Sequence, residues 1–134
     1  MSTAREAINS DGERVRIAAT YSFEAAHQLP HLPDGHKCKN LHGHNYRLDV
    51  SIAGRLDGRG FVIDYAELDG VVQPLVDMLD HRFLNDIDGL DNPTSEVMVR
   101  WFHERIKAAL PAYEPTVRIW ETPRYWVQFP AGDA

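Results

Sequence analysis

Two segments near the start of the chain alternate between apolar and polar residues, as half-buried β-strands do. From Val15 to His27 the odd positions are apolar or aromatic up to the final histidine, and most even positions are polar. From His42 to Ile52 the even positions read His, His, Tyr, Leu, Val, Ile. Because side chains alternate across a strand, each apolar set shares one face with its histidines. The pattern therefore predicts two strands whose apolar faces end in histidine.

The middle of the chain changes to the three- and four-residue spacing of amphipathic helices. Asp64 is placed to cap a first helix, which continues to Leu79 and contains Pro74, where a proline bends or divides a helix. A second helix is predicted to start at Asn92-Pro93-Thr94 and to end at Pro111. Each helix carries one apolar stripe, which needs a partner surface to cover it.

Two further strands are predicted after the helices, over residues 116–121 and 124–129, joined by a tight turn at Thr122-Pro123. The predicted order of elements is thus ββααββ. This order favours an α+β fold, a four-stranded antiparallel sheet with two helices packed on one face.

Length and composition indicate one globular domain over residues 15–130, preceded by a polar, unpatterned stretch at 1–14 that we expect to be a mobile extension. The net charge of -6 argues against nucleic acid as the main partner. No run approaches the roughly 18 apolar residues of a membrane span, and no apolar core of a signal peptide is present near the start. With a single cysteine, Cys38, no internal disulfide can form, which favours a reducing compartment such as the cytoplasm.

The histidines on the two apolar faces are candidate metal ligands. His27 comes from the first strand, and His42 and His44 from the second. Three nitrogen ligands without a thiolate are typical of a catalytic zinc site, which keeps one coordination position open. The alternative is that they are ordinary core or strand-end histidines. The shared faces favour Zn²⁺, although the His-x-His motif is weak evidence by itself.

Two other segments carry groups suited to proton transfer. Cys38 lies between Lys37 and Lys39, whose charges favour the reactive thiolate, although an inert cysteine is also compatible with this segment. Asp80 precedes His81, and a carboxylate beside an imidazole can orient it for proton transfer. A histidine interacting with the end of a helix is the alternative for this pair.

The last candidates suit the binding of a flat heterocycle. Glu121 shares its strand face with Val117 and Ile119, so its carboxylate should face inward, where it can accept two parallel N–H bonds. A solvated charge at a strand end is the alternative. The segment Thr94-Ser95-Glu96 opens the second helix, where it can cap the helix or hold a ligand with free N–H groups.

Together these motifs resemble the 6-pyruvoyl-tetrahydropterin synthase and 6-carboxytetrahydropterin synthase superfamily. The matching segments, in the order of that family, are Phe23-Glu24-Ala25-Ala26-His27, Cys38-Lys39-Asn40-Leu41-His42-Gly43-His44-Asn45-Tyr46, Leu79-Asp80-His81, Asn92-Pro93-Thr94-Ser95-Glu96 and Trp120-Glu121-Thr122. The spacing Cys-x-x-x-His-Gly-His is the compact form associated with the carboxy branch, which serves queuosine biosynthesis. The pyruvoyl branch typically has a longer gap.

The resemblance implies a tunnelling fold (T-fold) whose subunits form trimers that stack into hexamers, with active sites between subunits. It implies 7,8-dihydroneopterin triphosphate as substrate and zinc held by His27, His42 and His44. Cys38 and the Asp80–His81 pair would then be catalytic. A pterin would be bound by Glu121, with Thr94, Ser95 and Glu96 completing its pocket. The pyruvoyl reaction and a non-catalytic zinc- or pterin-binding protein remain alternatives, whereas the His-Glu-x-x-His helix of many metal-dependent hydrolases is absent.

Overall fold

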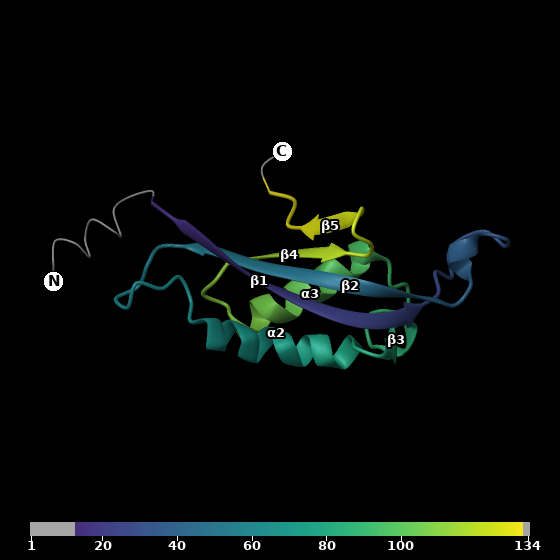
Figure 1. Cartoon of the computed structure of the whole chain (residues 1–134), viewed down its shortest axis with the longest axis horizontal. Coiled ribbons are helices and arrows are strands. Elements are labelled where there is room, and N and C mark those ends of the chain that lie inside the picture. Colours follow the sequence, from purple (N-terminus) through teal and green to yellow (C-terminus); the bar gives the residue numbers. More distant parts are fainter. Residues whose placement is uncertain (1–12, 133–134) are drawn as a thin grey trace.

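The computed structural model describes residues 13–132 as one sheet with two long helices packed against it. Figure 1 shows the long β1–β2 hairpin, with the helices on one side and the shorter β4–β5 hairpin beside it. Most of the extension expected at 1–14 lies outside the described residues. The elements are β1 (Val15–His27), η1 (Lys37–Lys39), β2 (His42–Gly54), α2 (Tyr65–Leu79), β3 (Arg82–Phe83), η2 (Leu84–Asp86), α3 (Ser95–Ala109), β4 (Pro115–Trp120) and β5 (Trp126–Phe129).

The predicted α+β fold is confirmed, with one strand more than expected. The strands are ordered β3-β1-β2-β4-β5. β1, β2, β4 and β5 pair antiparallel, as predicted, but β3 pairs parallel to β1 through Ala25–Arg82 and Ala26–Phe83. The prediction of a four-stranded, purely antiparallel sheet is therefore wrong in this detail. A strand of two residues is too short to produce an alternating pattern in a sequence.

The register of the β1–β2 hairpin puts both apolar sets on the same face. His27 pairs with His42, and Phe23 pairs with Tyr46. Side chains at paired positions of antiparallel strands project to the same side, so the two rows merge into one surface. The histidines therefore continue the apolar surface at the loop end of the hairpin.

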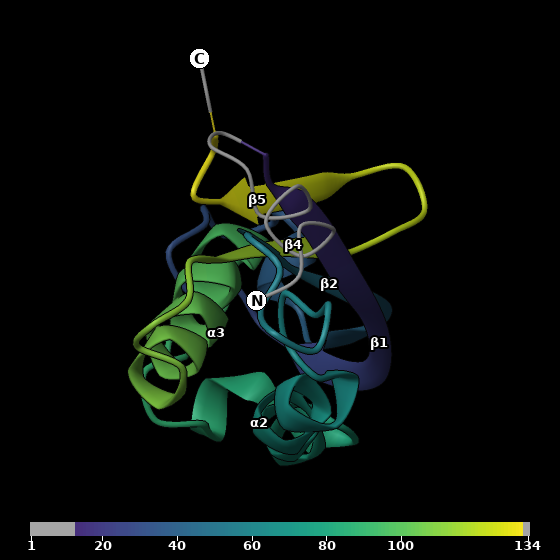
Figure 2. The ribbon, with the colours of Figure 1, turned by 90° about the vertical axis from the view of Figure 1, so that its left-hand side faces the viewer.

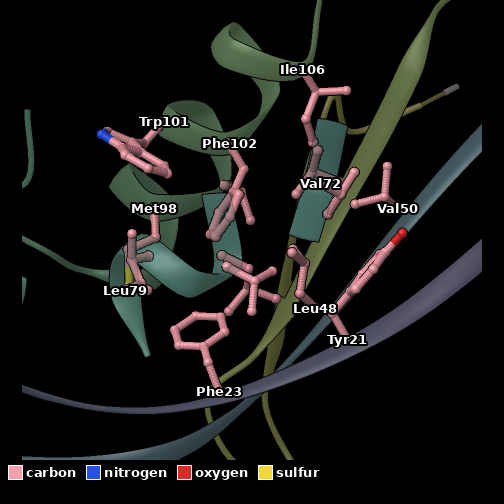
Figure 3. Close-up of a cluster of buried hydrophobic side chains, with 14 of the residues drawn as sticks. Tyr21, Phe23, Leu48, Val50, Val72, Leu79, Met98, Trp101, Phe102 and Ile106 are labelled. Carbon is pink, nitrogen blue, oxygen red and sulfur yellow. The ribbon is translucent and has the colours of Figure 1, made fainter. Parts of the chain in front are cut away.

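The helices cover this surface (Figure 2). α2 and α3 lie on the same side of the sheet, and their apolar stripes meet the side chains of β1 and β2 in the core (Figure 3). The core side chains Leu48, Val50 and Phe102 have no exposed surface. Among residues 13–132, none of the helices is long and apolar enough to cross a membrane.

α2 runs without interruption through Pro74. A proline inside a helix lacks the N–H that would bond the carbonyl four residues earlier, here that of Gly70. Gly70 and Pro74 both lie on the exposed face of α2, and no atom lies near the position of a Gly70 side chain. Solvent can hydrate the free carbonyl on this exposed face, so the helix continues.

Candidate metal centre and adjoining cavities

Three imidazoles converge at the end of the β1–β2 hairpin where the loop over residues 28–41 joins its two strands. One ring nitrogen from each of His27, His42 and His44 lies within 4.8 Å of the others. His27 Nε2 and His42 Nε2 are 3.0 Å apart. The expected convergence of these three histidines is thus confirmed.

Two backbone carbonyls hold the rings of His27 and His42 in place. The Nδ1 atom of His27 lies 2.9 Å from the carbonyl oxygen of Pro93, and that of His42 lies 2.7 Å from the carbonyl oxygen of Asn40. A carbonyl can only accept a hydrogen bond, so each Nδ1 carries the proton and donates it. In a neutral imidazole the other nitrogen is then an acceptor, so both Nε2 atoms present lone pairs.

This arrangement fits a metal ion. Two nitrogen lone pairs that face each other at 3.0 Å repel unless a cation lies near both. A histidine that binds a metal through one ring nitrogen commonly donates the N–H of the other to a backbone carbonyl, which fixes its tautomer and orientation. A donor set of three imidazoles without a thiolate suits zinc and several other divalent transition metals.

Burial favours the neutral form of the His27 and His44 imidazoles, the form in which histidine binds a metal. His27 is completely buried, and this burial lowers its pKa, with the nearby rings of His42 and His44 acting in the same direction. Burial also lowers the pKa of His44, although the neighbouring Glu121 carboxylate opposes the effect. Metal binding therefore has to displace few protons from these rings near neutral pH.

Tyr46 joins the histidine cluster to the core. Its ring stacks on Phe23 with centroids 5.0 Å apart, and its hydroxyl lies 3.3 Å from Nδ1 of His27. Burial raises the pKa of Tyr46, and the charge of Glu121 raises it further. The phenol therefore stays protonated beside the candidate ligand.

Glu121 lies directly beside the histidines, just after the end of β4. Its Oε1 atom is 3.5 Å from Nε2 of His44 and 3.8 Å from Nε2 of His27. Its backbone N–H donates to the carbonyl of Tyr125 at 3.2 Å, which holds the main chain at the β4–β5 turn. The inward orientation expected for Glu121 from its strand face agrees with this position.

A cavity of about 350 Å³ opens next to Glu121 and gathers the predicted pterin-binding residues. Its lining comprises Leu29, Thr94, Ser95, Glu96, Glu121, Tyr125, Trp126 and Val127. Ser95 is 8% exposed, and its hydroxyl has no hydrogen-bond partner. A buried hydroxyl without a partner is costly, and this one lies in the wall of the cavity.

Asp80 and His81 lie apart from that cavity. Asp80 Oδ1 is 3.1 Å from Nδ1 of His81, as expected for an orienting carboxylate, and also accepts the N–H of Glu24 at 3.0 Å. The Glu24 N–H and His81 together keep the pKa of Asp80 below its usual value. His81 is 73% exposed and has a left-handed backbone, with φ of 59°. It lines a second cavity of about 590 Å³ that also reaches Gly43 and His44.

Cys38 lies in the short helix η1, in the loop that follows β1. Its N–H donates to Nδ1 of His36 at 3.0 Å, and its carbonyl accepts the N–H of Leu29 at 3.1 Å. The thiol is half-buried and is not a member of the metal-ligand cluster. Lys39 forms an ion pair with Asp34. The assignment of Cys38 as a catalytic group remains a prediction.

Several residues that support the candidate centre were not identified from the sequence. Tyr46 shares a strand face with His42 and His44, so the alternation contained a signal for its position. No sequence signal marked the carbonyls of Asn40 and Pro93, because every residue has a carbonyl and only the fold determines where it points. Glu24, whose Oε2 lies 3.5 Å from Nε2 of His81, could be found only from the pairing of β1 with β3.

Comparisons with known proteins agree with this fold and cluster. Residues 16–131 match the family described as 6-pyruvoyl tetrahydropterin synthase. The 6-carboxy-5,6,7,8-tetrahydropterin synthase of Synechocystis is 43% identical over 99 residues, covering 69% of this chain and 75% of that protein. The dihydroneopterin monophosphate aldolase of Pyrococcus furiosus is 37% identical over 117 residues, covering 86% of this chain and 96% of that protein.

A solved structure extends the comparison to the backbone. The 6-pyruvoyl tetrahydropterin synthase of Caenorhabditis elegans superposes with a TM-score of 0.80 at 32% identity, covering 87% of this chain and 95% of that one. The molecule is thus a T-fold protein with a candidate three-histidine metal centre. It belongs to the 6-pyruvoyl tetrahydropterin synthase family.

Proposed function

We propose that this chain is a zinc-dependent 6-carboxy-5,6,7,8-tetrahydropterin synthase. It would convert 7,8-dihydroneopterin triphosphate and one water molecule to 6-carboxy-5,6,7,8-tetrahydropterin, acetaldehyde and triphosphate. The observation that carries the proposal is the convergence of three imidazoles beside the cavity lined by Glu121 and Ser95. The similarity to proteins named for this reaction supports the choice of product.

His27, His42 and His44 are the proposed zinc ligands. Zinc held there would act as a Lewis acid that polarises the hydroxyls of the substrate side chain and acidifies the neighbouring C–H bonds. The carbonyls of Asn40 and Pro93 orient two of these ligands, and Tyr46 packs behind His27.

Cys38 and His81 are the proposed proton-transfer groups. Cys38, as thiolate, takes a proton from a carbon of the substrate side chain, and His81, oriented by Asp80, returns or relays protons. Moving protons between neighbouring carbons rearranges oxidation states within the substrate, so the reaction needs no nicotinamide or flavin. Lys37 and Lys39 are placed in the same loop as Cys38, where their charges suit the triphosphate.

Glu121 is the proposed clamp for the pterin ring, whose amino and ring N–H groups match two carboxylate oxygens. Thr94, Ser95 and Glu96 complete the pocket. Their place beside Glu121 in the lining of one cavity supports this assignment. Glu96 is a second carboxylate in the same cavity and provides a matched comparison for Glu121.

We also propose that the active protein is a homohexamer, a dimer of trimers, with sites completed between subunits. The separation of the Asp80–His81 pair from the cavity of Glu121 supports this proposal, because a neighbouring copy could supply the missing group to each cavity. A closed ring of sheets would also pair the edge strand β5 with the length of β1 that the two-residue strand β3 does not cover. Sedimentation of the purified protein tests the assembly, and a stable monomer with full activity would contradict it.

Three alternative functions can be distinguished from the main proposal by the product that each would form, or by the absence of any product. A 6-pyruvoyl-tetrahydropterin synthase would eliminate triphosphate and keep the three-carbon side chain. A protein like the Pyrococcus relative would be an aldolase on the monophosphate, which the 37% identity makes a specific alternative. A zinc- or pterin-binding protein without catalysis would give no product.

The deciding experiment incubates the zinc-loaded protein with the triphosphate and, separately, with the monophosphate, and identifies the products by mass spectrometry. We expect 6-carboxytetrahydropterin and acetaldehyde from the triphosphate. The Cys38→Ala variant should keep its zinc and lose turnover. Pyruvoyl product, turnover of the monophosphate alone, or full activity of Cys38→Ala would each contradict part of the proposal.

The cellular role follows from the proposed product. We propose that the protein acts in the cytoplasm in queuosine biosynthesis, with a pterin triphosphate as its small-molecule partner. Expression in a bacterial strain that lacks its own 6-carboxytetrahydropterin synthase should restore queuosine in tRNA, and the Cys38→Ala variant should not.

A further inference from the structure

The position of Glu121 relative to the histidines is close to that of a metal ligand. Ligand atoms about 2.0 Å from a tetrahedral metal lie about 3.3 Å from one another. Glu121 Oε1 lies 3.5 Å from Nε2 of His44 and 3.8 Å from Nε2 of His27, and the Nε2 atoms of His27 and His42 are 3.0 Å apart. The two Glu121 separations exceed the tetrahedral value by a few tenths of an ångström. Glu121 is not a member of the three-histidine cluster as it stands, so its side chain has to turn to bring the carboxylate to a metal held there.

The hydrogen bonds around His27 give an electrostatic reason for this position. Its Nδ1–H is committed to the carbonyl of Pro93, so its Nε2 offers a lone pair toward the Glu121 carboxylate. An acceptor nitrogen and an anionic oxygen this close repel each other unless a cation lies between them. The carboxylate therefore joins the histidine nitrogens in forming a site for a positive ion.

The same carboxylate also lines the cavity that holds Thr94, Ser95 and Glu96. Its main chain is held by the bond to Tyr125, while its side chain, 31% exposed, can turn between the metal and the cavity. A pterin in the cavity would offer it two N–H donors, which compete with the metal for its oxygens.

We propose that Glu121 is a fourth metal ligand while the cavity is empty, and that it leaves the metal when a pterin enters. This exchange would keep the metal closed to other ligands until the substrate is in place. The ligand role depends on this chain's metal centre alone, whereas the exchange also rests on the proposed function, since it requires a pterin.

Metal binding tests the ligand role without any substrate. The purified full-length chain, stripped of metal, is titrated with Co²⁺, whose visible absorption reports the number and type of its ligands. Glu121→Ala should weaken cobalt binding at least about tenfold and change the absorption bands, because a charged ligand is lost. Glu96→Gln, which alters a carboxylate of the same cavity, should match the wild type.

Glu121→Gln provides a second variant that preserves the size of the side chain, in case the alanine variant is unstable. An amide is a poorer metal ligand than a carboxylate, so its cobalt spectrum should change in the same direction. Wild-type affinity and spectra in both Glu121 variants would overturn the ligand role.

The exchange is tested by adding 6-methylpterin, which has no side-chain hydroxyl to bind the metal, to the cobalt-loaded protein. The wild-type spectrum should shift toward that of Glu121→Gln, and the variant's spectrum should stay unchanged. Pterin binding, followed by fluorescence quenching, without a spectral shift would overturn the exchange. No pterin binding would overturn the substrate class of the proposed function and the exchange with it, while the cobalt titration still decides the ligand role.

Discussion

The face of the β1–β2 hairpin that points toward the helices has two parts. These parts differ in the segments that pack against them. In the middle of the hairpin, Leu48 and Val50 have no exposed surface and pack under α2 and α3 (Figure 3). At its loop end, His42 and His44 are half-buried and lie beside backbone carbonyls and Glu121. The strands and their alternation are the same in both parts.

Alternation along the strands determines which side chains share a face. The segments that pack against this face determine whether it becomes hydrophobic core or a candidate metal centre. The helical side chains over Leu48 and Val50 offer apolar contact, so the residues under them are apolar. Loop carbonyls offer acceptors, so imidazoles can be buried there with one nitrogen satisfied and the other free. Tyr46, stacked on Phe23 and close to His27, marks the boundary.

The largest expected effect on folding comes from the core part. Leu48→Ala removes a fully buried side chain and should lower the free energy of unfolding by about 3 kcal/mol. Urea denaturation of the metal-free protein measures this loss. The folded variant should still bind one metal ion per histidine cluster with unchanged affinity, and a weakened metal site would show that the two parts are not independent.

The opposite result is expected at the histidine end. His42→Ala removes a nitrogen whose lone pair faces that of His27, so the metal-free protein should lose less than about 1 kcal/mol of stability. Metal affinity should fall at least about 100-fold, because one of three ligands is lost. Zinc content after dialysis and urea denaturation test both statements, and an unchanged metal content would contradict the ligand assignment.

The boundary residue should show an intermediate and smaller response. Tyr46→Phe keeps the stacked ring and removes only the hydroxyl, while Nδ1 of His27 keeps its bond to Pro93. The free energy of unfolding should fall by about 1 kcal/mol or less, and metal affinity should fall less than in His42→Ala. A loss of metal as large as that of His42→Ala would place Tyr46 within the metal centre.

The smallest effect is expected from the face of the sheet that the helices do not cover. Burial alone would raise the pKa of Asp49, but hydrogen bonds from Arg47, Trp120 and Thr20 outweigh it and hold the pKa below its usual value. A carboxyl with a lowered folded pKa stabilises the protein above its unfolded pKa of about 3.9, and this stability is lost as the pH falls through the folded value.

Below a pH of about 4, protonation of Asp49 should therefore lower the free energy of unfolding of the wild type. Asp49→Asn has no carboxyl at this position, so it should not show this loss. Urea denaturation of the metal-free proteins between about pH 3 and 6 measures the difference, which we expect to be about 0.5 kcal/mol. Parallel pH curves for the two proteins would show that the Asp49 contacts contribute nothing.

Local patterns were sufficient for most of the fold. Alternation predicted β1 with the bounds that the structure has, Val15–His27, and helical spacing predicted α2 from its cap at Asp64 to Leu79. β3 was missed because two residues form no period. Pro74 does not divide α2, because the Gly70 carbonyl that it leaves without a partner lies on the exposed face, where solvent can hydrate it.

The sequence by itself determined which residues share a face, and therefore that His27, His42 and His44 would meet. That inference needs only the two-residue period of a strand and an antiparallel pairing. Only the tertiary structure decided which carbonyls orient these rings, that Glu121 lies beside them, and that Asp80 and His81 line a different cavity. These facts depend on distances between segments that are remote in sequence, which are set by how the loops and helices pack rather than by any local pattern.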